Sequence, residues 1–165
     1  MPGLVYDLMD ILDKQLIHFD ELINLSTLKK ELIISNDTAG LSRVTAKENA
    51  ITNKLQKLDK TRASLMSDIS NVIGKTAGVT LSELADKLRS QPEHERLNAL
   101  AVSTRDKLQE LKTLNDLNRS LIDSSLDYIS FTINAIRSSL LPEQAIYSKD
   151  GEELGQRQSF FDAKQ

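Results

Sequence analysis

Apolar residues recur at alternating spacings of three and four over most of the first 140 residues, which is the pattern of amphipathic α-helices that pack on one another. The longest such pattern covers residues 92–140, contains no internal Gly or Pro, and is followed by Pro142. At about 1.5 Å per residue this helix is roughly 70 Å long, too long for a compact globule. The pattern therefore predicts one long helix that needs partner helices along its length. Its expected core positions are Leu97, Ala101, Thr104, Leu108, Leu111, Asn115, Asn118, Ile122, Ser125, Ile129, Ile133, Ile136 and Leu140.

Two further long helices are predicted over residues 4–35 and 41–73. The first has two adjacent apolar stripes, which indicates contact with two neighbours. Between the helices, Asn36 and Asp37 interrupt the pattern, and either one is a suitable N-cap for the second helix. Gly74 follows the second helix in the usual C-terminal position.

A short helix is predicted from Thr80 to about Leu88, because Thr80 and Glu83 have the spacing of a capping box. The short connections favour antiparallel neighbours. We therefore expect an all-α fold, an elongated, antiparallel, left-handed bundle of three long helices with the short helix capping one end. The expected domains are a helical bundle at residues 1–141 and an extended C-terminal arm at residues 142–165.

The three long helices differ in length, and the difference predicts an uncovered surface. The last helix has about a dozen residues more than the others, so its C-terminal part has no full-length neighbour. Apolar residues continue there, namely Leu126, Ile129, Phe131, Ile133, Ile136 and Leu140. Such a surface usually marks a binding site for a partner helix. There are two alternatives to a partner helix. Self-association into a homodimer would cover this surface, and so would the arm with its apolar Phe160 and Phe161.

Composition and charge exclude several other classes of protein. The 165 residues include no Cys or Trp, which removes disulfides and cysteine metal sites, and few Gly or Pro, which disfavours a β-rich fold. A net charge of −3 gives no basic field for nucleic acid. No basic region precedes the first apolar residues, and acidic residues interrupt every apolar run. We therefore expect neither a signal peptide nor membrane insertion, and a cytoplasmic protein.

One triplet imitates a nucleotide-binding motif. Gly74, Lys75 and Thr76 match the end of a phosphate-binding loop, but Ile69 occupies the position of the required first Gly. The triplet also follows a helix C-terminus, where the helix dipole repels anions. It is better interpreted as the end of a helix.

The two histidines do not form a metal-binding pattern. A di-iron bundle places Glu three residues before His on facing helices, whereas Gln15 precedes His18 and Gln91 precedes His94 at that spacing. No combination of nucleophile, base and anion hole is evident either. We therefore expect no catalytic residues, no metal and no cofactor.

Asn115 and Asn118 are polar residues at consecutive core positions of the long helix. A buried amide costs stability unless it is hydrogen-bonded, and such an Asn can fix the register of packed helices. Register control is the first interpretation, and recognition of a partner is the alternative.

The sequence around these residues resembles a known family. Residues 114–122, LNDLNRSLI, are similar to the Leu-Asn-x-x-Asn-x-x-Leu-Leu stretch in the last helix of the FlgN family of flagellar export chaperones. Residues 147–151, YSKDG, resemble the Tyr-Gly-x-Asp-Gly element of that family's C-terminal arm, with Ser148 in place of Gly. The chain also departs from the family at its end, where FFDAK replaces a basic tail.

The resemblance implies a cytosolic type III export chaperone that needs no bond-making chemistry. Its cargo would be the terminal helices of hook-associated (hook-filament junction) proteins, which it keeps from assembling early and brings to the flagellar export gate. In the family the C-terminal region binds cargo, so Phe160 and Phe161 join the cargo-binding set. Tyr147, Asp150 and Gly151 correspond to the gate-docking element. The alternative is a structural coiled-coil adaptor without a role in export.

Overall fold

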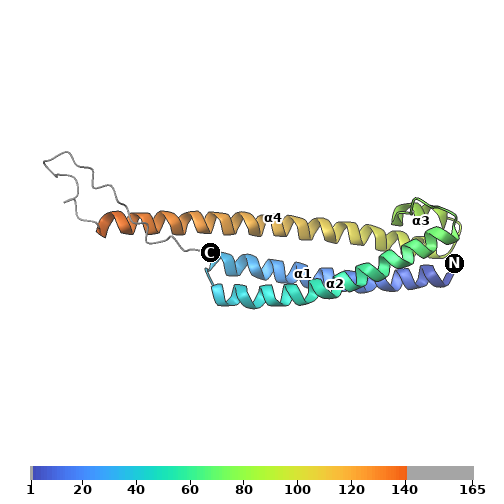
Figure 1. Ribbon diagram of the computed structural model, residues 1–165, viewed down its shortest axis with the longest axis horizontal. Helices are drawn as coiled ribbons and strands as arrows, with labels where there is room; N and C mark the ends of the chain where they lie inside the picture. The colour runs from blue at the N-terminus through green and yellow to red at the C-terminus, as the bar shows by residue number, and fades with distance from the viewer. Residues whose placement is uncertain (1, 141–165) are drawn as a thin grey trace. The chain divides into compact units, whose positions relative to one another are not determined.

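The computed structural model describes residues 2–140, and these form four α-helices with no strand among them (Figure 1). The helices are α1 (Pro2–Ile34), α2 (Thr38–Val72), α3 (Leu81–Lys87) and α4 (Glu93–Leu140). The predicted all-α class, with three long helices and one short helix, is confirmed. The long helices begin and end within three residues of the boundaries expected from the sequence.

The turn between α1 and α2 depends on three residues. Asn36 adopts a left-handed conformation with φ of 55°, and the carboxylate of Asp37 accepts a hydrogen bond from the backbone N–H of Gly40 at 2.8 Å. Asp37 is therefore the N-cap of α2. A Cβ atom on Gly40 would lie 2.5 Å from Asp37 Oδ2 and 2.8 Å from Leu32 Cδ2. Glycine in this first turn thus makes room for the cap.

The predicted capping box of α3 is present. The N–H of Glu83 donates to Thr80 Oγ1 at 3.2 Å, and the N–H of Thr80 donates to Glu83 Oε2 at 2.9 Å. The other oxygen of Glu83 pairs with Lys75 Nζ at 2.9 Å. The hydrogen bond from Thr80 and the Lys75 ammonium lower the pKa of Glu83. These contacts tie the segment after α2 to the start of α3.

All four helices contribute to the buried core. The core side chains come from the beginnings of α1 and α4, the end of α2 and most of α3; they are Val5, Leu8, Met9, Leu12, Ile69, Leu84, Ala85, Leu88, Leu97 and Leu100. His94 adds a polar contact there, since its Nδ1 donates to the Ala85 carbonyl oxygen at 2.7 Å. The short helix therefore closes this part of the core.

Helix α1 contacts both other long helices. It packs against α2 after the Asp37 turn, and ion pairs join it to α4 through Asp13 with Arg96 and Asp20 with Lys107 (Figure 1). Contact with two neighbours is what its two apolar stripes predicted.

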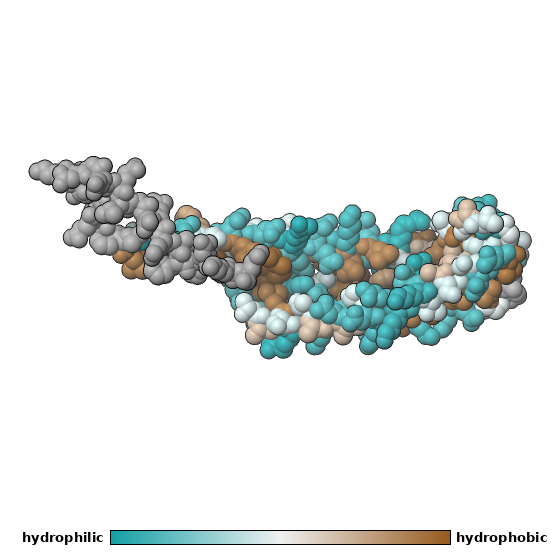
Figure 2. Space-filling model, viewed as in Figure 1, coloured by the Kyte–Doolittle hydropathy of each residue, from teal (hydrophilic) through white to brown (hydrophobic). Residues whose placement is uncertain are grey.

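The core of α4 is less covered than the heptad pattern predicted. Leu108 and Ile122 are 46% and 37% exposed, although both occupy expected core positions. Leu55, at a core position in the middle of α2, is half-buried. Apolar atoms are recessed between the mostly polar atoms of α2 and α4 in Figure 2. A heptad pattern marks the side of a helix that needs cover but does not say whether one neighbour or two supply it.

The chain divides into two compact units, one ending at Leu126 and the other beginning at Asp127. The first holds α1, α2, α3 and most of α4. The described part of the second is the C-terminal portion of α4. None of the described helices is both long and apolar enough to span a membrane.

Candidate protein-binding site

The C-terminal portion of α4 carries the apolar side chains that the sequence singled out. Leu126, Ile129, Phe131, Ile133, Ile136 and Leu140 are between 41% and 74% exposed. We call these six residues the α4 strip. The exposure expected from the length of this helix is therefore found, while the binding role of the strip stays a prediction. Tyr128, which the sequence argument passed over, is also exposed here, at 70%.

The α4 strip suits association with another helix. Four of its members, Ile129, Ile133, Ile136 and Leu140, recur at the spacings of three and four that align side chains along one face. Burying apolar surface yields about 25 cal/mol per Å², so a partner that covers several of these side chains gains several kcal/mol before the costs of association. An amphipathic helix laid along the strip is the simplest such partner.

Asn115 and Asn118 lie earlier in α4, and the structure separates them. Asn118 is 3% exposed, and its Nδ2 donates to the Ser26 carbonyl oxygen of α1 at 2.8 Å. Asn115 is exposed, and its Oδ1 accepts a long hydrogen bond of 3.4 Å from Ser26 Oγ. Both amides therefore contact α1, but only Asn118 is buried, because the neighbouring helices leave the side of α4 at Asn115 partly open. The register role of the two residues stays a prediction.

Two buried polar residues of α1 escaped the sequence argument. Gln15 and Ser26 are 4% and 1% exposed. They continue the spacing of three and four set by the buried Leu12, Phe19 and Leu22. Both side chains are polar, so an apolar stripe does not include them. Continuing the heptad count through polar residues would have identified both.

Five of the predicted site residues lie outside the described residues. They are Tyr147, Asp150 and Gly151, assigned to export-gate docking, and Phe160 and Phe161, assigned to cargo binding. Their roles remain predictions from the resemblance.

The structure also shows where the residues that were considered for nucleotide or metal binding lie. Gly74 has φ of 67° directly after the C-cap of α2, in agreement with its interpretation as the end of a helix. His18 Nδ1 lies 2.8 Å from Glu21 Oε2 on the surface of α1. Among the described residues, no group of three or more His, Cys, Asp or Glu side chains is placed to hold a metal ion.

A helical fold with an exposed apolar helix face is typical of proteins that bind other proteins. The chain belongs to the FlgN family, since the family model described as FlgN protein matches residues 1–155. FlgN proteins are flagellar export chaperones and not enzymes, so membership supports a general role in flagellar export. Comparison with curated proteins and with solved structures finds no significant match.

Proposed function

We propose that this protein is a cytosolic chaperone for hook-associated (hook-filament junction) proteins. It binds their terminal helices, prevents their premature assembly and delivers them to the flagellar export gate. Family membership supports the chaperone role, and the exposed α4 strip is the observation that supports helix binding. The chemistry is burial of apolar surface and requires no cofactor.

In this proposal the cargo helix lies along the α4 strip, and Phe160 and Phe161 add apolar contacts. The helices of residues 1–141 form a left-handed antiparallel bundle that supports the strip. Residues 142–165 act as an arm, in which Tyr147, Asp150 and Gly151 dock on the export gate after cargo has bound.

Co-purification with a hook-associated protein tests the proposal. The full-length chain should retain the hook-associated protein and lose it when that protein's terminal helix is removed. The variant Ile129→Ser/Ile133→Ser/Ile136→Ser should bind at least tenfold more weakly. A matched control, Ser130→Ala/Asn134→Ser/Ser138→Ala, changes neighbouring polar positions of the same helix and should bind like the unaltered chain. Equal retention of cargo by both variants would show that cargo does not bind to the α4 strip.

A structural coiled-coil adaptor is the alternative function. An adaptor would be an obligate oligomer with its apolar surfaces covered, and it would not retain a hook-associated protein. Light scattering on the isolated chain, combined with the co-purification, separates the two.

A further inference from the structure

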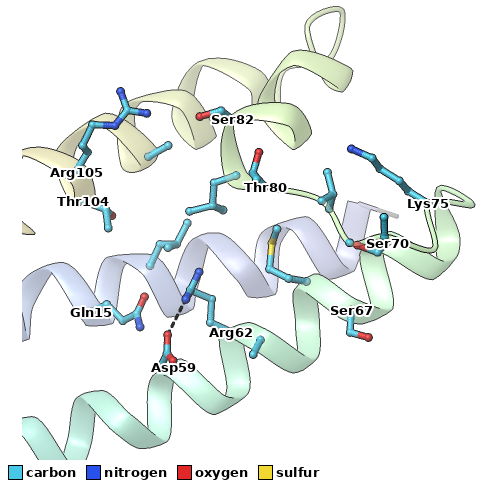
Figure 3. A pocket seen from close by; sticks show the side chains of 18 of the residues that line it. Gln15, Asp59, Arg62, Ser67, Ser70, Lys75, Thr80, Ser82, Thr104 and Arg105 are labelled. Carbon is cyan, nitrogen blue, oxygen red and sulfur yellow. Dashed lines mark hydrogen bonds and ion pairs between the residues drawn. The ribbon is translucent and has the colours of Figure 1, made fainter.

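A second apolar recess lies between α2 and α4, away from the α4 strip and entirely within residues 2–126. Three hollows form it, with volumes of about 1060, 420 and 400 Å³. The hollows adjoin one another: the largest and the smallest share Phe19 and Asp59, and the smallest shares Thr52 with the third. Together we call them the trough. Figure 3 shows its largest hollow, with Gln15 of α1 and Thr104 of α4 directed toward it from different helices.

The size of the trough matches a helix. Along α2 its lining extends over residues 48–71, which is about 35 Å at 1.5 Å per residue. Half-buried Leu55 on α2 faces the hollows, as do the exposed Leu108 and Ile122 on α4. Rows of side chains at helical spacing on two helices accept the ridge of a further helix. A fourth helix packed on α1, α2 and α4 would complete a bundle of the common four-helix kind.

Buried polar atoms in the trough lack partners. Ser70 Oγ, Thr104 Oγ1 and Asn118 Oδ1 are buried without a hydrogen bond, and within the described residues these are the buried side-chain atoms in that state. All three residues line the trough. Ser70 is 4% exposed. Buried polar groups are normally satisfied, so the packing around these three atoms is incomplete in the chain alone.

The charge of the trough is opposite to that of the chain. The whole sequence has 21 Lys and Arg against 24 Asp and Glu, a net charge of −3. Two carboxylates, Glu48 and Asp59, line the trough, and each is already paired at 2.7 Å with a trough cation. The lining cations number six, namely Lys29, Lys60, Arg62, Lys75, Arg105 and Arg119.

Three of these cations are available to a ligand. Lys29 pairs with Glu48, Arg62 with Asp59 as the dashed line in Figure 3 marks, and Lys75 with Glu83. Lys60, Arg105 and Arg119 have no ion-pair partner among the described residues. An occupant with acidic residues on its flanks would pair with them.

We propose that the trough between α2 and α4 binds an acidic amphipathic helix of a partner protein, which packs on α1 as a fourth helix. A second copy of this chain is a poorer match. Its described exposed apolar segment, residues 127–140, carries one acid and one base, Asp127 and Arg137, and so lacks the negative charge that the trough requires. The inference concerns a different surface from the α4 strip and does not rest on the proposed function.

A designed peptide pair tests the charge requirement. The acidic probe is a helical peptide of about 20 residues with Leu at core positions, Glu at flanking positions and Ala elsewhere, and the basic probe replaces Glu with Lys. In fluorescence anisotropy titrations of the full-length chain, the acidic peptide should bind at least tenfold more tightly than the basic one. Its affinity should fall as salt is raised from about 0.05 to 0.5 M. Equal affinity for both peptides would overturn the proposal.

Matched variants locate the binding. Ala63→Trp fills the trough, whereas Ala50→Trp adds the same side chain to an exposed position of α2 outside it. Arg105→Glu/Arg119→Glu removes two unpaired cations, whereas Lys112→Glu reverses an exposed charge of α4 outside the trough. Ala63→Trp and the double variant should each weaken the acidic peptide at least tenfold, and their controls should remain within twofold. Normal binding by Ala63→Trp would contradict the proposal.

Three further measurements test whether the peptide binds the α4 strip instead, and whether a second copy or the chain's own C-terminal segment occupies the trough. Ile129→Ser/Ile133→Ser/Ile136→Ser should bind the acidic peptide normally, and loss of binding there would place the peptide on the α4 strip instead. The chain should have the same mass in light scattering with and without Ala63→Trp. A dimer that this substitution dissociates would make a second copy the occupant and overturn the proposal. Phe160→Ser/Phe161→Ser should leave the affinity unchanged, and a tenfold increase would make the chain's own C-terminal segment the occupant.

Discussion

Asn118 of α4 is held against α1 through the main chain of Ser26, because its Nδ2 donates to the Ser26 carbonyl oxygen at 2.8 Å while its Oδ1 is buried without a partner. The contact joins residues 92 positions apart in the sequence. The contact links α4 to α1 at a cost, since half of the amide is unsatisfied.

Replacement of this amide should therefore stabilise the protein. We expect Asn118→Leu to raise the free energy of unfolding by about 1 kcal/mol, since it removes an unpaired buried oxygen while the Ser26 carbonyl keeps its bond within α1. The melting temperature should rise by about 2–4 °C in calorimetry. The control Asn115→Leu, at an exposed position, should change the free energy by less than about 0.5 kcal/mol.

The register interpretation also predicts what the double variant retains. Asn115→Leu/Asn118→Leu should still bind cargo, although its oligomeric state in light scattering is free to change once the polar register contact is gone. A folded double variant that no longer binds cargo would show that these amides recognise the partner.

The first turn of α2 should be sensitive to a single methyl group. Gly40→Ala places a Cβ 2.5 Å from the carboxylate that caps the helix, so the Asp37 side chain must move away. We expect a loss of about 1 kcal/mol, comparable to the loss of an N-cap, in urea unfolding. Gly3→Ala is the control, because no atom lies within 4 Å of its added Cβ. Equal stability of both variants would show that the cap accommodates the methyl group.

Glu83 should contribute to the acid sensitivity of the region around α3. Its pKa in the folded protein is lowered by the Thr80 N–H and by Lys75. A lowered pKa means that the contribution is fully present above the unfolded-state pKa and is lost as the pH falls through the folded-state pKa. In urea titrations, Glu83→Gln should be less stable than the unaltered chain at pH 7, and the difference should shrink toward acid. A difference that does not depend on pH would contradict this assignment.

The α4 strip and the core should respond differently to truncation. Ile129→Ser/Ile133→Ser/Ile136→Ser alters exposed side chains, so the melting temperature should change little. Leu97→Ala removes a side chain that is 0% exposed and should cost about 2–5 kcal/mol. Thermal unfolding followed by circular dichroism checks both. Cooperative unfolding of the triple variant at a much lower temperature would mean that the strip belongs to the core.

Local rules account for what the sequence predicted well. The Thr80 capping box, the Asp37 cap and the end of α2 at Gly74 each depend on a few neighbouring residues, so the helix boundaries follow from short segments. The all-α class follows from the apolar spacing of the long helices.

Long-range packing determines the features that could not be predicted from the sequence. The exposure of Leu108 and Asn115 depends on how many helices cover α4, which no local pattern states. The unpaired hydroxyl of Thr104 and the basic lining of the trough arise when α1, α2 and α4 come together, so neither was visible in the one-dimensional pattern. Gln15 and Ser26 were missed for a different reason, since both obey the heptad spacing but are polar.

Hydrogen–deuterium exchange tests most directly whether cargo docks on the C-terminal portion of α4, as we propose. The full-length chain would be compared with and without the terminal helix of a hook-associated protein. Backbone amides of residues 126–140 should exchange at least tenfold more slowly in the complex, because this otherwise solvent-exposed segment becomes packed against the cargo. Slowing confined to residues 48–71 and 101–122, with residues 126–140 unchanged, would place cargo in the trough and contradict the account.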